Sequence, residues 1–141
     1  MKLELISDYS CPFCYLAEVR IQKVLKDLHA NIQVKHICYQ LDPKAPSFTL
    51  KSSYEVFAQK YGVDIESAKA QMKPLEKQAE DMGVKINYAK IQSTSTLLAH
   101  EFAKAYEAQT KDSSVHIKLY QAYFELGYNL GGLFTGLGIS S

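Results

Sequence analysis

Two cysteines separated by two residues have the clearest chemical potential in this sequence. Cys11 and Cys14 enclose Pro12 and Phe13 in a Cys-Pro-Phe-Cys motif. Thiols at this spacing can close and reopen a disulfide, and in a reducing compartment such a pair is redox-active or metal-binding more often than structural. Our first hypothesis is therefore thiol–disulfide exchange, with Cys11 and Cys14 as catalytic residues and Pro12 and Phe13 as supporting residues.

The motif lies where a predicted strand is followed by a predicted helix. Residues 2–7 alternate polar and apolar side chains, as a strand does, and Pro12 suits the first turn of a helix. A thiol at a helix start faces unpaired backbone N–H groups and the positive end of the helix dipole, and both favour the thiolate. The sequence therefore predicts that Cys11 attacks, with a pKa below those of Cys14 and Cys38. Cys14 would then resolve the mixed disulfide.

A zinc site is the main chemical alternative. Cys11, Cys14, His36 and Cys38 could supply four zinc ligands. His36 and Cys38 lie two residues apart on a predicted strand, so their side chains would face the same side. A proline at a helix start suits redox chemistry better, so we assign no metal ligand and no cofactor, and we keep zinc binding as the alternative.

The first forty residues predict a strand–helix–strand unit. Ile21, Val24, Leu25 and Leu28 are spaced at i, i+3, i+4 and i+7, which predicts one buried stripe along the helix. Residues 32–39 are rich in β-branched side chains and predict the second strand. Elements in this order form a right-handed crossover with parallel strands.

The rest of the chain divides into a helical region and an atypical tail. Apolar stripes at helical spacing continue to Leu126, and Asp64 is placed to cap one of these helices. After Glu125 no charged residue appears, and five of the seven glycines lie between residues 127 and 141. We therefore predict one domain with three parts: the N-terminal unit 1–44, the helical region 45–126 and the glycine-rich tail 127–141.

Composition and charge exclude several classes of partner. The 141 residues fit one domain, and a net charge of +1 gives no strong attraction to nucleic acid or anionic lipid. No run approaches the roughly 18 apolar residues of a membrane span, and Glu4 and Asp8 interrupt any signal-peptide pattern. Three cysteines are too few for a secreted disulfide scaffold, and an odd number cannot all form pairs within the chain. The sequence thus predicts a cytoplasmic protein with no nucleic-acid or membrane partner.

The segment around the motif resembles the active-site segment of the DsbA family in the thioredoxin superfamily. Residues 8–16, D-Y-S-C-P-F-C-Y-L, are most similar to the cytoplasmic FrnE-like branch, where D-x-x-C-P-[WF]-C-Y follows the first strand. Further segments match that branch in order: Y-Q-L-D-P at 39–43, Ala99-His100 (with Ser95 in place of the usual Asn), and L-Y-Q-A-Y-F at 119–124. The resemblance covers roughly residues 3 to 130.

The resemblance implies an α/β thioredoxin-like fold with an all-helical insertion. It also implies dithiol–disulfide exchange on protein or small-thiol substrates without a cofactor. The family also resembles 2-hydroxychromene-2-carboxylate isomerases and kappa-class glutathione transferases, which have serine where Cys11 stands. A complete Cys-x-x-Cys motif here therefore favours redox chemistry. The physiological substrate and the direction of electron flow stay open.

The tail departs from the family pattern. The family continues beyond the Y-F segment with strands, a closing helix and a cis-proline that faces the motif, and residues 127–141 match none of these. We therefore expect the C-terminal strands and helix to be missing, and self-association through unpaired strand edges. The alternative function is a non-catalytic fragment, truncated or completed by a partner chain.

Overall fold

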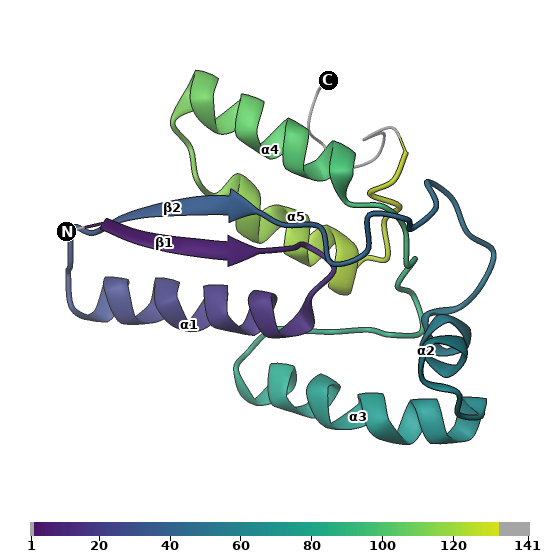
Figure 1. The fold of residues 1–141 in the computed structure, drawn as a ribbon. Helices are drawn as coiled ribbons and strands as arrows, with labels where there is room; N and C mark the ends of the chain where they lie inside the picture. Colours follow the sequence, from purple (N-terminus) through teal and green to yellow (C-terminus); the bar gives the residue numbers. More distant parts are fainter. Residues whose placement is uncertain (1, 133–141) are drawn as a thin grey trace.

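The two predicted strands pair in parallel and form a small sheet beside the helices. The computed structural model describes residues 2–132 of the chain. Strands β1 (Lys2–Ser7) and β2 (Gln33–Cys38) are connected by helix α1 (Pro12–Asp27) (Figure 1). In the register of the pair, Leu5 lies opposite His36. The predicted strand–helix–strand unit with parallel strands is confirmed.

Four helices follow β2. Helices α2 (Ser53–Tyr61) and α3 (Ile65–Asp81) contact each other, and Figure 1 shows them beyond the carboxyl ends of the strands. Helices α4 (Leu97–Thr110) and α5 (Val115–Phe124) also contact each other, and α5 packs against α1. The Asp64 side chain accepts a hydrogen bond from the Ser67 N–H at 2.7 Å, so the predicted cap of α3 is confirmed.

The aromatic core joins the first turns of α1 to α5. The Tyr15 ring, which is fully buried, stacks on the rings of Tyr120 and Phe124 with centroid distances of 5.3 and 5.5 Å. The prediction of one buried stripe along the whole of α1 is wrong, because Val24 and Leu28 are 52% and 70% exposed. The buried residues of α1 lie near its start, where α5 packs against it.

The sheet is open within the described part of the chain. Its order is β1-β2, so each strand has one hydrogen-bonded neighbour among residues 2–132. Ile6 on β1 is 69% exposed. Most of the predicted tail, residues 133–141, lies outside the described residues, while Leu130 before it is buried in the core. The α/β thioredoxin-like class with a helical insertion agrees with this arrangement.

Candidate functional site: a dithiol at a helix start

The thiol motif has the helix-start geometry that its sequence predicts. Cys11 is the N-cap residue of α1, and Pro12 occupies the first turn. The Cys14 backbone N–H donates a hydrogen bond to the Cys11 Sγ at 3.3 Å. The Cys11 N–H in turn donates to the Asp8 carbonyl at 3.1 Å, which closes the turn between β1 and α1. The helix thus presents a backbone donor to the first sulfur.

The two thiols are hydrogen-bonded to each other and titrate as a pair. This bond lowers the pKa of Cys14 to about 6 and raises the pKa of Cys11. The helix start predicts the opposite order, with Cys11 as the more acidic thiol. The Cys11 thiol donates its proton in a hydrogen bond to the Cys14 thiolate. The prediction from the helix start considers only backbone N–H groups and the helix dipole, and so leaves this bond out. Backbone N–H groups of Phe13 and Cys14 still favour a negative Cys11 sulfur.

A buried carboxylate supports the turn that leads into the motif. The Asp8 side chain, which is 2% exposed, accepts a hydrogen bond from the Leu41 N–H at 2.8 Å and pairs with the His100 Nε2 at 3.1 Å. Burial alone would raise the pKa of Asp8, but the hydrogen bonds from His100, Leu41 and Thr96 together lower it. Asp8 therefore connects the turn before the thiol motif both to the segment after β2 and to α4.

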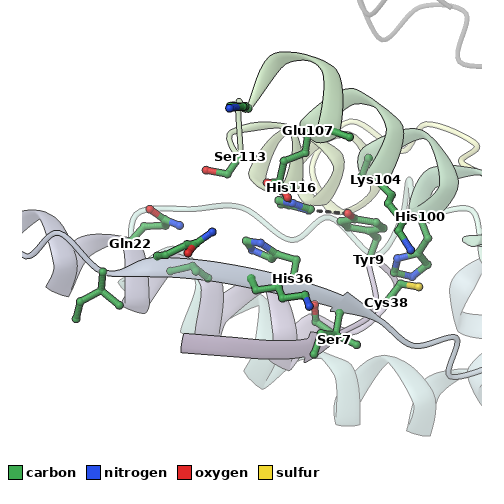
Figure 2. A pocket seen from close by; sticks show the side chains of 18 of the residues that line it. Ser7, Tyr9, Gln22, His36, Cys38, His100, Lys104, Glu107, Ser113 and His116 are labelled. Atoms are coloured by element: carbon green, nitrogen blue, oxygen red, sulfur yellow. Dashed lines mark hydrogen bonds and ion pairs between the residues drawn. The ribbon is translucent and has the colours of Figure 1, made fainter. Parts of the chain in front are cut away.

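A second group of polar side chains lies beyond Tyr9 (Figure 2). The Tyr9 hydroxyl is hydrogen-bonded to the His116 Nδ1 at 2.8 Å, and the His116 Nε2 lies 3.1 Å from a Glu107 carboxylate oxygen. The His36 ring stacks on the His116 ring at 3.6 Å, and Glu18 accepts from the His36 Nε2 at 3.0 Å. Burial lowers the pKa of His116, and the neighbouring His36 lowers it further.

This group lies in the wall of a cleft of about 990 Å³. The cleft runs along β2 and is closed on its other side by residues of α4 and by His116 of α5 (Figure 2). Cys38 and His100 both line it, and His100 pairs with Asp8, three residues before Cys11. Neither Cys11 nor Cys14 lines it, so the cleft and the dithiol are separate features of the described structure.

The four-residue zinc site predicted as an alternative is wrong. Among residues 2–132, the side chains close enough to share an ion are His36, Glu107 and His116, and no cysteine belongs to that group. The physical reason is distance along α1. His36 reaches Glu18, seven residues after Cys11, and at about 1.5 Å per residue this places the two roughly 10 Å apart along the helix.

Sequence reasoning missed most of the buried polar residues around the motif. Asp8 and His100 belong to the segments that resemble the DsbA family, so that pattern contains a signal for their positions. The amphipathic pattern around His116 predicts only a packing or surface residue at that position. Nothing in the sequence around Glu18 or Glu107 indicates that either belongs to a polar cluster. Tyr9 and His116 are 107 positions apart in the chain, and no local spacing rule connects residues so distant.

Comparison with known proteins identifies the family. The family model of the DSBA-like thioredoxin domain matches residues 2–132. The chain belongs to this family. Among solved structures, it is similar to the crystal structure of a probable DsbA oxidoreductase from Streptomyces coelicolor, SCO1869, with a TM-score of 0.78 and 25% identity. Among curated proteins, it is 27% identical over 135 residues to YwbO of Bacillus subtilis, which is described as uncharacterized.

This DsbA-family chain spans little more than half the length of those relatives. It covers 60% of YwbO and 54% of the Streptomyces protein, whereas 93% and 88% of this chain take part in the two matches. Within residues 2–132, none of the helices has the length and apolar character needed to cross a bilayer.

Proposed function

We propose that this chain is a thiol–disulfide oxidoreductase that uses Cys11 and Cys14. The observation that carries the proposal is the hydrogen-bonded dithiol at the start of α1, with one pKa lowered to about 6. Family membership supports oxidoreductase activity in general. The specific motif, the assignment of roles to the two sulfurs and the substrate class are our inference.

In the proposed reaction, the two cysteines pass two electrons to a disulfide. A thiolate at Cys11 attacks one sulfur of the substrate disulfide, and the other substrate sulfur leaves as a thiolate. Cys14 gives its proton to the departing substrate thiolate, and the resulting Cys14 thiolate attacks the Cys11 Sγ. This attack breaks the mixed disulfide, releases the second substrate sulfur as a thiolate and leaves an intramolecular disulfide. A small thiol reductant restores the dithiol, and the same steps in reverse oxidise a substrate dithiol.

Cys11 is assigned the attack because of its place at the helix start. Its sulfur accepts the Cys14 backbone N–H, which stabilises negative charge there once the shared proton moves to Cys14. Phe13 is 65% exposed beside it and offers an apolar contact to a protein or small-molecule substrate. Pro12 holds the first turn without requiring a backbone partner.

The test is reduction of insulin and of a glutathione mixed disulfide by the wild-type chain, Cys11→Ser and Cys14→Ser. We expect turnover by the wild-type chain and none by Cys11→Ser. Cys14→Ser should retain the first attack and accumulate a mixed disulfide at Cys11, which mass spectrometry would detect. Equal, near-background rates for a folded wild-type chain and Cys11→Ser would contradict the proposal.

That negative result would favour the second candidate function, a non-catalytic fragment that completes its fold with a partner chain. The open two-stranded sheet of residues 2–132 is the observation that favours this candidate.

We also propose a cytoplasmic location. Three cysteines are a low and odd number, which suits a reducing compartment better than a secreted disulfide scaffold.

A further inference from the structure

His36, Glu107 and His116 form a compact donor cluster in the wall of the cleft (Figure 2). One ligand atom from each lies within 4.8 Å of the other two. The three residues come from β2, α4 and α5, which are brought together only by the fold. Two imidazoles and one carboxylate are a common ligand set for zinc and similar divalent ions.

Each histidine of the cluster is held at its remote nitrogen by another side chain. Glu18 binds the His36 Nε2, with both carboxylate oxygens within 3.1 Å, and the Tyr9 hydroxyl binds the His116 Nδ1 at 2.8 Å. In metal sites, such outer partners fix the tautomer and orientation of a ligating histidine. They leave the His36 Nδ1 and the His116 Nε2 as the nitrogens available for an ion.

The His36 Nδ1 is an unexplained buried polar atom. The His36 side chain is 6% exposed, and this nitrogen has no hydrogen-bond partner in the described structure. Figure 2 shows the ring directed from β2 toward His116 and Glu107. In the neutral form of the ring, with Glu18 accepting the Nε2 proton, Nδ1 offers its lone pair. A buried polar atom of this kind rarely stays without a partner.

We propose that His36, His116 and Glu107 bind one divalent cation of the zinc class, separate from the redox thiols. The ligand atoms would be the His36 Nδ1, the His116 Nε2 and a Glu107 carboxylate oxygen, with a further coordination position open to the cleft. The carboxylates of Glu18 and Glu107 balance the charge of a dication. This inference does not depend on the proposed thiol chemistry.

Binding requires a small local movement. An imidazole nitrogen binds a metal ion in the plane of its ring. The rings of His36 and His116 are now stacked at 3.6 Å with 16° between their planes, so they must tilt before both nitrogens point at one ion. The Glu107 side chain is 33% exposed and can follow them, and the adjoining cleft gives the ion a path of entry.

The experiment is a cobalt(II) titration of the full chain carrying Cys11→Ser, Cys14→Ser and Cys38→Ser, which removes every thiol that could bind the ion. We expect one cobalt per chain, a visible spectrum without a thiolate charge-transfer band, and displacement by zinc. Circular dichroism would first establish that this variant is folded. If it is not, the same titration uses the wild-type chain oxidised to its Cys11–Cys14 disulfide, with Cys38 alkylated.

Two isosteric substitutions on α4 locate the site. Glu107→Gln removes a ligand and should weaken binding at least tenfold, while Glu101→Gln, the same change at an exposed position of the same helix, should leave the affinity within about twofold. Equal affinity for the two variants, or cobalt binding that disappears once the thiols are removed or blocked, would overturn the proposal. An absence of binding at millimolar cobalt in the folded chain would also overturn it.

Discussion

Above about pH 6, the two sulfur atoms of the reduced dithiol hold one proton between them. The hydrogen bond between Cys11 and Cys14 means that loss of the first proton leaves a thiolate solvated by the other thiol. One thiol of the pair therefore has a pKa of about 6, and the second proton is held more tightly. At neutral pH the reduced pair has one negative charge, which is the form that attacks a disulfide.

Alkylation against pH measures this pair directly. In a Cys38→Ser background, we expect the rate of reaction with iodoacetamide to rise as the pH increases through about 6 and then to level off near neutrality. Cys14→Ser removes the thiol partner and should move the midpoint toward the ordinary thiol value of about 8.5. A midpoint near 8.5 in both proteins would show that the thiols do not share a proton.

Asp8 connects the turn before the thiol motif to two other segments of the chain. Its carboxylate joins the turn to Leu41 and His100, and its charge raises the pKa of the nearby Cys14. Because the folded-state pKa of Asp8 is lowered, its ionised form stabilises the fold above the unfolded value of 3.8. That contribution is lost as the pH falls through the lower folded-state value.

Asp8→Asn should therefore destabilise the chain by about 3 kcal/mol at neutral pH, because it breaks a buried pair and leaves His100 without its carboxylate. Denaturant unfolding would measure the change. Asp42→Asn, the same substitution at an exposed turn residue, should cost less than about 0.5 kcal/mol. Similar losses for the two variants would argue against a special role for Asp8.

The pH dependence of stability gives a second test of Asp8. As the pH falls below 3.8, the free energy of unfolding should decrease more in the wild-type chain than in Asp8→Asn.

The sequence was sufficient to find the thiols and insufficient to find their surroundings. Cys11 and Cys14 are neighbours in the chain, and one helical turn fixes their geometry, so spacing alone predicts them. The Asp8–His100 pair joins residues 92 positions apart. The order of the two thiol pKa values also depends on a side-chain hydrogen bond that a motif does not specify.

At the scale of elements, the backbone after α5 lies close to the backbone of the segment between α3 and α4, residues 82–96. The Phe124 carbonyl accepts from the Asn87 N–H at 2.7 Å, and the Gly127 carbonyl accepts from the Gln92 side chain at 3.0 Å. Gly127 has a φ of 72°, and a Cβ at this position would overlap the backbone of Lys90. The left-handed backbone conformation at this position favours glycine, and the space beside Lys90 is too small for a side chain.

Gly127→Ala should lower the free energy of unfolding by about 3 kcal/mol, since it adds steric overlap to the cost of a left-handed backbone. The matched control is Gly83→Ala. Gly83 has a φ of 81°, but a methyl group added there would meet nothing within 4 Å, so we expect a loss of about 1 kcal/mol from conformation alone. Thermal and urea unfolding would compare the two, and equal losses would mean that the contact with Lys90 is unimportant.

The elements themselves were largely predictable, because capping and periodicity are local. Asp64 caps α3 as its side chain predicts, and the strands lie where alternation and β-branched residues predict them. The buried face of α1 was not predictable over its full length. Periodicity shows that Val24 and Leu28 share a stripe, but it does not show which turns of the helix have a neighbour.

At the scale of the whole molecule, the described structure leaves part of its small sheet uncovered. Ile6 is 69% exposed and Leu3 is 36% exposed, both on β1, and one edge of β1 has no strand beside it within residues 2–132. Exposed edges with apolar side chains tend to recruit other chains. Self-association was an expectation from the sequence, and it remains a prediction here.

Sedimentation at several concentrations would test it. We expect the wild-type chain to associate at concentrations on the order of 10 µM, a weak contact by the usual scale of affinities, and Ile6→Lys to shift the equilibrium toward monomer by placing a charge beside the edge. Leu28→Lys introduces the same charge at an equally exposed apolar residue just after α1, away from the strands, and should not change the association. A monomeric wild-type chain would contradict the prediction.

The uneven burial of α1 has a consequence for how the molecule opens. The first turns of this helix are anchored by Tyr15 in the aromatic core, whereas Val24 and Leu28 are exposed at its other end. Amide protons near Asp27 should therefore exchange with solvent through frequent local fraying, while those near Cys14 should exchange only when the core itself opens. The dithiol is thus held at the rigid end of a helix whose other end can unwind without disturbing it.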